Sequence, residues 1–212
     1  MTCRGVLIAF EGGEGAGKST QARLLADAID AELTREPGGT DLGDRIREWL
    51  LHPDAHDEGR SLDPRTELML MLAARAQHVS ERIGPVLESG RDVVVDRFSA
   101  STLAYQGYGR GLPIEEVRRA CSLASGDLWP DLNILLDVAP AIGAGRAAPC
   151  SLPDRIEAEG EGFHERVALG FRALAAADSD RWVVIDASLD VGAVARAVRE
   201  AVSTLRRRGG PR

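Results

Sequence analysis

Residues 9–20 read Ala9-Phe10-Glu11-Gly12-Gly13-Glu14-Gly15-Ala16-Gly17-Lys18-Ser19-Thr20, and this stretch decides the fold of the chain. Gly12 and Gly17 enclose four residues and lead directly into Lys18, which gives the spacing G-x-x-x-x-G-K-[ST] of a phosphate-binding loop. The apolar run before it, residues 5–10, predicts a buried parallel strand, and residues 21–29 carry apolar side chains at helical spacing. A strand, a glycine-rich loop and a helix in this order turn backbone N–H groups and a helix N-terminus toward an anion. The sequence therefore predicts a binding site for a nucleoside triphosphate.

Each residue type in the loop has a physical task. Glycines let the backbone wrap a phosphate where a Cβ atom would collide. Lys18 supplies a compact positive charge for the β- and γ-phosphates, and the hydroxyl of Ser19 can hold Mg²⁺. We expect ATP to be bound by Gly12, Gly13, Glu14, Gly15, Ala16, Gly17, Lys18, Ser19 and Thr20.

The composition of the whole chain limits the classes of protein to which it can belong. Its 212 residues, 44% of them hydrophobic and 28% charged, suffice for one globular domain or for one domain with an insertion. A net charge of −7, from 33 acidic against 26 basic side chains, argues against a general nucleic-acid partner. No apolar run approaches the roughly 20 residues of a membrane helix, and no signal segment is recognisable, so we expect no membrane partner. Cys3, Cys121 and Cys150 are odd in number and lack C-x-x-C spacing, which favours a cytoplasmic protein.

Strand and helix patterns alternate along the chain. Apolar runs predict five buried strands, at residues 5–10, 31–34, 92–95, 132–138 and 182–186. Helical periodicity predicts helices at residues 21–29, 41–51, 64–83, 113–125, 163–177 and 191–205. This alternation is typical of an α/β fold with a doubly wound, five-stranded parallel sheet flanked by helices. We predict a single domain over residues 1–212.

Three segments fall outside this pattern. Residues 52–63 contain Pro53 and Gly59 and predict a loop. Residues 141–162 are low in apolar content and resemble a mobile flap, or lid insertion, rather than a part of the core. Residues 206–212 predict a solvated, frayed tail.

Charged residues follow two of the predicted strands. Arg35 and Glu36 end the second strand, whereas Asp96 and Arg97 end the third, at the edge where doubly wound sheets place their ligands. An Asp at this place is what P-loop enzymes use for Mg²⁺, and the fork of Arg97 can bind a phosphate through two nitrogens. We therefore expect Asp96 and Ser19 to hold a metal ion.

The predicted helix 64–83 is apolar on nearly every side over residues 68–74, so we expect it to be buried on more than one side, one face on the domain and another against a second subunit. Arg75 follows this run. It is either near-buried with an anionic partner or extended to solvent, and the sequence leaves both open.

Residues 99–111 combine aromatic with hydrogen-bonding side chains, namely Ser101, Thr102, Tyr105 and Gln106. This is the composition of a pocket for a base and a sugar. The alternative is a helix start that is capped by Ser99 or Ser101.

Four motifs then occur in order: residues 10–20, residues 34–40 (Thr-Arg-Glu-Pro-Gly-Gly-Thr), residues 96–107 (Asp-Arg-Phe followed by Ser-Thr-Leu-Ala-Tyr-Gln-Gly) and residues 154–157 (Asp-Arg-Ile-Glu). Together they resemble the bacterial thymidylate kinase (dTMP kinase) family over essentially the whole chain. The first motif is shared by all P-loop proteins, whereas the second and third are far more specific. The resemblance implies a homodimeric nucleoside-monophosphate kinase that converts ATP and dTMP to ADP and dTDP with Mg²⁺.

The resemblance also implies residue roles. Arg75 and Arg97 would hold the phosphate and the thymine edge of dTMP, with Tyr105 against the deoxyribose and Glu14 near the sugar hydroxyl. The substrate-binding set is Glu14, Glu36, Pro37, Arg47, Met71, Arg75, Arg97, Ser101, Thr102, Tyr105 and Gln106. Transfer would be direct and in line, because placement and positive charge limit a reaction between two anions. The catalytic residues would be Lys18, Asp96, Arg97 and Arg146.

The chain departs from this family at two places. Met71 stands where relatives usually stack a Phe on thymine, and it is either a base contact of comparable strength or a core filler. The phosphate loop lacks the arginine that some relatives carry, and the lid supplies only Arg146 and Arg155. We expect Arg146 to act in catalysis and Arg155 to be held by Asp154 or Glu157.

The residues leave three alternatives to a dTMP kinase. One is a P-loop kinase for a deoxynucleoside or for another monophosphate. Arg75 and Arg97 argue against the deoxynucleoside, because two buried cations suit a phosphorylated acceptor better than a neutral one. The second is a nucleotide-binding switch protein, but the chain has no Asn-Lys-x-Asp stretch for reading guanine. The third is a kinase-like protein that only binds nucleotides because its lid has lost arginines.

Overall fold

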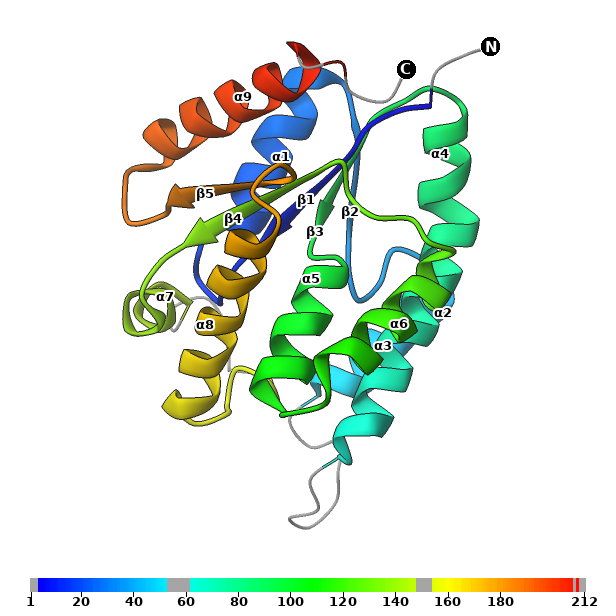
Figure 1. Ribbon diagram of the computed structural model, residues 1–212, viewed down its shortest axis with the longest axis vertical. Helices are drawn as coiled ribbons and strands as arrows, with labels where there is room; N and C mark the ends of the chain where they lie inside the picture. Colours follow the sequence, from blue (N-terminus) through cyan, green and yellow to red (C-terminus); the bar gives the residue numbers. More distant parts are fainter. Residues whose placement is uncertain (1–3, 53–61, 148–153, 208, 210–212) are drawn as a thin grey trace.

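The structure, a computed structural model, describes residues 4–52, 62–147, 154–207 and 209. Its centre is a five-stranded sheet with the strand order β2-β3-β1-β4-β5, in which every neighbouring pair is parallel (Figure 1). The strands are β1 (Leu7–Glu11), β2 (Glu32–Arg35), β3 (Val93–Asp96), β4 (Leu132–Asp137) and β5 (Trp182–Asp186). The predicted doubly wound parallel sheet is confirmed.

Helices cover both faces of this sheet (Figure 1). One face is covered by α1 (Lys18–Ile29) and α9 (Val191–Arg207). The other carries α3 (Pro64–His78), α4 (Gly84–Glu88), α5 (Ser99–Thr102), α6 (Ile114–Ser125) and α8 (Glu161–Ala177). The helix α2 (Asp41–Leu51) packs on α3, and α7 (Pro140–Ala147) follows β4.

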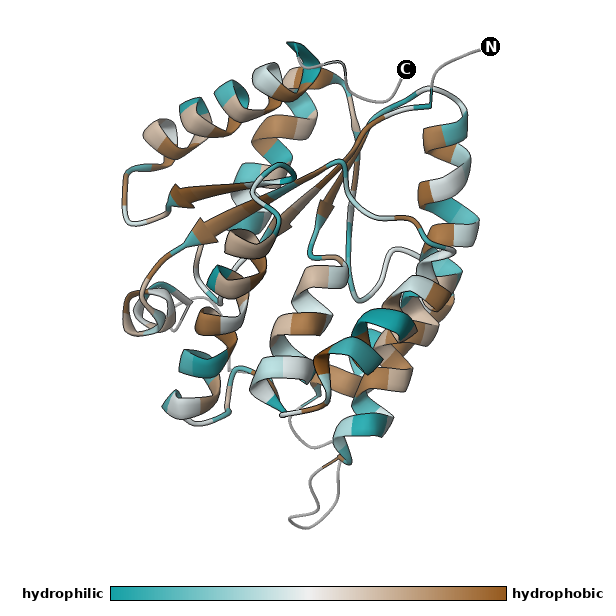
Figure 2. Ribbon diagram, viewed as in Figure 1, coloured by the Kyte–Doolittle hydropathy of each residue, from teal (hydrophilic) through white to brown (hydrophobic). Residues whose placement is uncertain are grey.

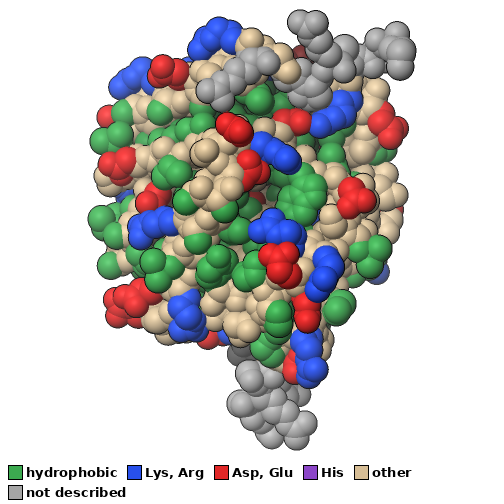
Figure 3. Space-filling model, viewed as in Figure 1, with side chains coloured by type: hydrophobic (Ala, Val, Ile, Leu, Met, Phe, Trp, Pro, Cys, Tyr) green, Lys and Arg blue, Asp and Glu red, His purple; other side chains and the backbone are tan. Residues whose placement is uncertain are grey.

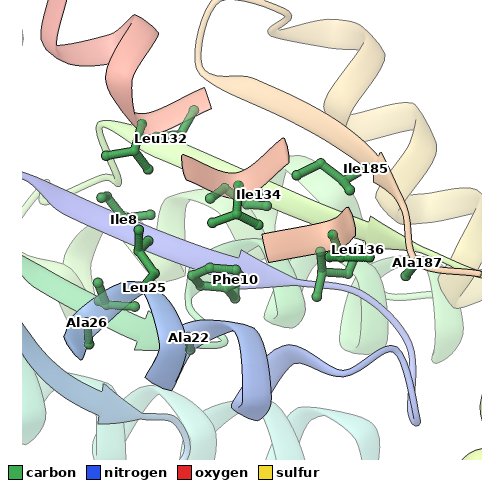
Figure 4. Packing of buried hydrophobic residues seen from close by; sticks show 14 of the residues in the cluster. Ile8, Phe10, Ala22, Leu25, Ala26, Leu132, Ile134, Leu136, Ile185 and Ala187 are labelled. Carbon is green, nitrogen blue, oxygen red and sulfur yellow. The ribbon is translucent and has the colours of Figure 1, made fainter. Parts of the chain in front are cut away.

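The central strand β1 is apolar throughout because it is buried from both sides. Ile8 and Phe10 pack toward α1 and α9, as Figure 4 shows, whereas Leu7 and Ala9 pack toward α4 on the opposite face. In Figure 2 the strands β1, β3 and β4 are mostly brown, which agrees with this burial. Since both faces of a parallel sheet are covered by helices, its strands show continuous apolar runs instead of alternation.

The helical run that begins with α3 is longer than predicted. It passes through a π-helical stretch, η2 (Val79–Ile83), directly into α4, although the predicted helix ended at residue 83. The N–H of Gly84 donates to the carbonyl of Val79, and Pro85 falls in the first turn of α4, where a missing N–H costs no hydrogen bond. The predicted end at residue 83 is therefore wrong.

The residues of the predicted base pocket also form a helix. The helix α5 runs into a second π-helical stretch, η3 (Leu103–Gly109), which carries Tyr105 and Gln106. A helix start and a pocket were alternatives for this segment. The structure shows a helix, and Ser101, Thr102, Tyr105 and Gln106 on this helix also line a cavity.

Two of the irregular segments are partly ordered. The helix α7 occupies the start of the predicted lid, and Ile156 is buried in the core beside Phe163, so the expectation that this segment stays outside the core is wrong there. The helix α9 extends to Arg207, and Arg206 donates to Asp92 at 2.7 Å, so these two residues are not a frayed tail. Most of the predicted loop, as well as residues 148–153, 208 and 210–212, lies outside the described residues.

The described helices include none that is long and apolar enough to cross a membrane. Figure 3 shows acidic and basic side chains interspersed over one face of the molecule. Lys18 and Arg75, by contrast, are only 6% and 3% exposed. The cations that matter for binding are thus inside the molecule, at the carboxyl ends of β1 and β3 and on the helices beside them.

Candidate active site

The glycine-rich loop connects β1 to α1 at the carboxyl edge of the sheet. Gly12 has a φ of 139°, and a Cβ atom there would lie 2.5 Å from the carbonyl oxygen of Leu136 in β4, so the position requires glycine. The Nζ atom of Lys18 donates to the carbonyl oxygen of Gly13 at 2.6 Å. The loop therefore curls around its own lysine at the N-terminus of α1, which is the arrangement that receives a phosphate.

Arg97 closes the loop from the side of β3. Its Nη1 donates to the carbonyl oxygen of Gly12 at 2.9 Å, its Nη2 pairs with the carboxylate of Glu14, and its guanidinium lies 5.1 Å from the ring centroid of Tyr105. The hydroxyl of Tyr105 donates to the same carboxylate of Glu14 at 3.1 Å. The loop, Arg97 and Tyr105 thus form one connected charged unit.

The charges of this unit shift one another's pKa values. Burial would raise the pKa of Glu14, but the charges of Arg97 and Lys18 hold it well below its usual value. Burial, together with the repulsion from Arg97, lowers the pKa of Lys18 to about 8. Glu11 lies at the end of β1, and its burial raises its pKa to about 7, although it accepts hydrogen bonds from Ser101 and from the N–H of Phe98.

Asp96 has the oxygen atoms of a cation site. Its Oδ2 accepts a hydrogen bond from Ser19 Oγ at 2.5 Å, whereas its buried Oδ1 has no hydrogen-bond partner in the described part of the chain. A buried carboxylate oxygen without a partner is unusual and needs an explanation. Mg²⁺ takes oxygen ligands and often only one or two from the protein, the rest being water and phosphate. The described residues hold no group of three or more His, Cys, Asp or Glu side chains that could bind a metal, so a two-residue site of this kind fits better than a closed cage.

A cavity opens beside the loop, and we call it the arginine-lined cavity. It is lined by every residue of the predicted substrate-binding set, namely Glu14, Glu36, Pro37, Arg47, Met71, Arg75, Arg97, Ser101, Thr102, Tyr105 and Gln106. The lining also includes residues that were not predicted, namely Leu51, Phe98, Asp154, Ile156 and Glu157. Residues from four distant parts of the sequence therefore meet in one place, as their motifs suggested.

Met71 and Ser101 show how the cavity differs in detail from expectation. Met71 packs against the core and also lines the cavity, so contact with a base stays a prediction that its position allows. Ser101 Oγ donates its proton to Glu11 Oε2 at 2.5 Å. A bound ligand would therefore meet Ser101 as a hydrogen-bond acceptor.

Arg75 is buried and paired, so the alternative in which it extends to solvent is wrong. Its Nε donates to Glu36 Oε2 at 2.7 Å and its Nη2 to Thr102 Oγ1 at 2.9 Å. His78 is fully buried and contacts Glu36 Oε1 at 3.0 Å and Thr34 Oγ1 at 2.7 Å. This chain of contacts fixes Arg75 against the end of β2. The sequence analysis missed His78, although its spacing of three residues from Arg75 places both on one helix face.

The two arginines of the predicted lid have different surroundings. Arg146 donates to the carbonyl oxygens of Ala187 at 2.6 Å and Ser188 at 3.2 Å, after β5. Arg155 donates to Glu67 at 2.7 Å and to the carbonyl oxygen of Leu50 at 2.9 Å. Arg155 is thus held by a carboxylate as predicted, but that carboxylate is neither Asp154 nor Glu157. The reason is that Glu67, on α3, is buried next to it, and a local sequence window cannot show this.

The lid helix α7 lies directly against the phosphate-binding loop. A Cβ atom on Gly143 would lie 2.2 Å from the carbonyl oxygen of Glu14, and one on Gly15 would lie 1.9 Å from the carbonyl oxygen of Gly143. Two glycines therefore allow a backbone-to-backbone contact between the loop and α7.

Comparisons with known proteins identify the family of the chain. The sequence model of the family "Thymidylate kinase" matches residues 10–198. The chain is 49% identical over 208 residues to a thymidylate kinase of Thermomicrobium roseum, covering 95% of this chain and 96% of the relative. It is 50% identical over 187 residues to one of Synechococcus sp. (strain JA-3-3Ab), covering 86% and 87%. A crystal structure of thymidylate kinase from Ehrlichia chaffeensis superposes with a TM-score of 0.75 at 30% identity, covering 94% of this chain and 99% of that one.

The chain belongs to the thymidylate kinase family. It is a phosphotransferase, which phosphorylates dTMP to dTDP with ATP as the donor. This membership excludes the switch protein and the kinase for a different acceptor that the residues alone left open.

The lowered pKa of Lys18 predicts how the affinity for ATP depends on pH. Below pH 8 the free enzyme already carries the charge that the phosphates need, and above it a proton must be taken up on binding. We expect the affinity to fall above pH 8, by up to about tenfold per pH unit. Isothermal titration calorimetry with ATP at a series of pH values measures this.

A Lys18→Arg variant is the control, because its charge does not titrate in this range and its weaker binding should not change with pH. An unchanged affinity of the wild type up to pH 9.5 contradicts the prediction.

Proposed function

We propose that ATP and dTMP bind end to end across Arg97, and that the γ-phosphoryl group passes directly between them. The observation that carries this proposal is the position of Arg97, which donates to the phosphate-binding loop at Gly12 and also lines the arginine-lined cavity. ATP would occupy residues 12–20, and the phosphate of dTMP would lie in the cavity between Arg97 and Arg75.

Direct phosphoryl transfer requires mainly correct placement of the two substrates and positive charge around their phosphates. Two anionic phosphates repel each other, so the site must neutralise them and align donor with acceptor. Lys18, Arg97 and Arg75 are fixed cations in a buried setting, where their effect on a developing charge is larger than in water. At present their charges are balanced by Glu14 and Glu36. An incoming phosphate would offer these arginines a second anion, so they could bind it from the positions in which the two carboxylates hold them.

The residues of the cavity fit the nucleoside of dTMP. Tyr105 and Glu14 line the cavity, and the deoxyribose would lie against them. The ring of Tyr105 would then occupy the space that a 2′-hydroxyl group needs. Gln106, Thr102, Ser101 and Met71 would surround thymine. Pro37 and Arg47 would close the cavity from the side of α2, since Arg47 Nη1 donates to the carbonyl oxygen of Pro37 at 3.1 Å.

The proposal includes Mg²⁺ bound with ATP. Ser19 Oγ and the unpartnered Oδ1 of Asp96 are the oxygen atoms that would hold the ion or its water. Mg²⁺ supplies positive charge to the β- and γ-phosphate oxygens. Asp96 is the last residue of β3, and Arg97 follows it directly. The proposed ligand of Mg²⁺ and the proposed phosphate-binding arginine would therefore be adjacent residues.

Replacing Asp96 with Asn tests the metal site. The amide keeps the shape of the side chain but loses its charge, so we expect kcat to fall by about a hundredfold or more and the Mg²⁺ concentration for half-maximal rate to rise. A coupled ADP assay with dTMP over a series of Mg²⁺ concentrations measures both quantities.

Asp92→Asn is the matched control, because Asp92 lies just before the other end of β3 and pairs with Arg206. Its Mg²⁺ dependence should equal that of the wild type. The same dependence in Asp96→Asn would remove Asp96 from the metal site.

We keep Arg146 as the catalytic arginine of the lid in this proposal. Arg146 lies on α7, which contacts the phosphate-binding loop, and it donates to the carbonyl oxygens of Ala187 and Ser188. Arg155, by contrast, is paired with the buried carboxylate of Glu67, which it would have to leave in order to bind a phosphate.

Replacing each lid arginine with Ala separates their roles. We expect Arg146→Ala to lower kcat by a factor on the order of 10³ with a smaller change in KM for ATP, and Arg155→Ala to lower kcat much less. Steady-state kinetics with both substrates varied measures this. Equal, small effects contradict the assignment, and a raised KM for ATP at unchanged kcat would make Arg146 a binding residue only.

A homodimer is also part of the proposal, and α3 offers the surface. Met69 is 60% exposed, and Ala73 and Ala76 continue an exposed apolar stripe at helical spacing on the helix that carries Arg75. On the neighbouring α6, Leu123 is 86% exposed. Exposed apolar side chains of this size on adjacent helices are typical of an interface.

A charge placed on this stripe should separate the subunits. We expect Met69→Glu to be a monomer at micromolar concentration in sedimentation velocity experiments, where the wild type is a dimer. Leu169→Glu, which alters an equally exposed residue of α8, should remain a dimer. A dimeric Met69→Glu variant would place the interface elsewhere, and a monomeric wild type would remove the dimer from the proposal.

Cytoplasmic location stays a prediction from the cysteine content. Cys121, on α6, is a free and buried thiol.

A further inference from the structure

Glu67 is the most heavily bonded carboxylate next to the arginine-lined cavity. It lies on α3 and is fully buried. Its Oε1 accepts hydrogen bonds from Gln106 Nε2 at 2.8 Å and from Arg110 Nε at 3.2 Å. Its Oε2 accepts from Arg110 Nη2 at 3.0 Å and from Arg155 Nη2 at 2.7 Å. One side chain thus joins α3, η3 and the segment that follows the lid.

Glu67 is an acceptor only. Burial alone would raise the pKa of Glu67, but the hydrogen bonds from Arg110, Gln106 and Arg155 hold it below its usual value. An ionised carboxylate offers lone pairs and no proton. Each group that touches it must therefore be a donor.

This condition fixes the orientation of the Gln106 side chain. An amide has an oxygen acceptor on one side and an NH₂ donor on the other, and the two are nearly equal in shape. If the amide turned over, its Oε1 would face a carboxylate oxygen at hydrogen-bond distance, which is repulsive in a buried setting. With Nε2 bound to Glu67, the carbonyl oxygen Oε1 is the acceptor that Gln106, a residue of the cavity lining, offers to a ligand.

An oriented acceptor distinguishes keto from amino pyrimidines. The edge of thymine carries an N3–H donor next to the O4 acceptor, whereas 5-methylcytosine carries an N3 acceptor next to an amino donor. Gln106, on η3, lines the cavity four residues after Thr102, the last residue of α5. Its acceptor Oε1 complements the N3–H of thymine and would be mismatched with the N3 acceptor of 5-methylcytosine.

We infer that Glu67 is a positioning residue that makes the enzyme select a keto over an amino pyrimidine, by fixing the amide of Gln106 with its carbonyl oxygen toward the base. This inference rests on the proposed binding of thymine beside Gln106. Glu67 itself does not line the cavity, so it acts through Gln106.

The test compares dTMP with the 5′-monophosphate of 5-methyldeoxycytidine, which differs from it only at positions 3 and 4 of the ring. The quantity measured is the ratio of kcat/KM for the two acceptors, because a partly unfolded or slow variant lowers both values equally. In Glu67→Gln the amide of Gln106 can adopt either orientation, so we expect this ratio to fall by about tenfold, the worth of one buried hydrogen bond.

Two further variants identify the cause. Gln106→Leu removes the acceptor itself, and the ratio should fall at least as far. Arg110→Lys disturbs another partner of Glu67 without touching its contact with Gln106, and its ratio should equal that of the wild type.

The outcomes separate this inference from the proposed site. An unchanged ratio in Gln106→Leu means that Gln106 does not read the base, so that part of the proposed site fails and the inference fails with it. A reduced ratio in Gln106→Leu with an unchanged one in Glu67→Gln overturns the inference alone. A reduced ratio in Arg110→Lys also overturns it, because the effect would then come from general disturbance of the network.

Glu67→Asp covers the case in which Glu67→Gln does not fold. The shorter side chain keeps the negative charge between Arg110 and Arg155 but withdraws its oxygen from Gln106. The ratio should again fall, and an unchanged ratio would overturn the inference.

Discussion

The contact between Arg97 and the phosphate-binding loop is the interaction on which the rest of the site depends. A buried guanidinium needs anionic and carbonyl partners, and Arg97 finds them in Glu14 and in the carbonyl oxygen of Gly12. The pair ties the end of β3 to the end of β1, which are neighbouring strands of the sheet. Because Arg97 also lines the arginine-lined cavity, the donor and the acceptor of the phosphoryl group would share one fixed cation in the proposed site.

The same principle recurs around the cavity. Two further arginines beside the cavity are held by buried carboxylates from other elements, in the pairs of Arg75 with Glu36 and of Arg110 with Glu67. An unpaired charge in these positions would cost several kcal/mol, so the pairs fix the side chains in place before any ligand arrives. A site that carries its cations in a fixed position loses little free energy in arranging them during the reaction. The acidic residues of the cavity are therefore as much a part of phosphate binding as the arginines are.

Much of this arrangement could be predicted from local sequence. The phosphate-binding loop is a contiguous motif, so its glycines, Lys18 and Ser19 could be assigned by spacing alone. The strands could be predicted because burial on both faces makes them continuously apolar. The helical run from α3 to α4 was predicted to end at residue 83, which is too early. A π-helical turn lets the helix continue through Pro85, and no residue pattern signals such a turn. Glu67, His78 and Glu11 were missed, because an acid or a histidine within an apolar stretch gives no sign of which distant donor it will meet.

The sequence by itself determined the class of fold and the phosphate-binding loop, because these depend on periodicity and on a contiguous motif. Its resemblance to a family also indicated residues that line the arginine-lined cavity. Only the tertiary structure decided which charges pair. It showed that Arg155 is bound to Glu67 instead of its sequence neighbours, that Arg146 reaches the carbonyl oxygens after β5, and that Gln106 is oriented by an acid on another helix. The physical reason is that a hydrogen bond depends on distances of about 3 Å between atoms, and these are set by how the helices pack on the sheet and not by the spacing of residues along the chain.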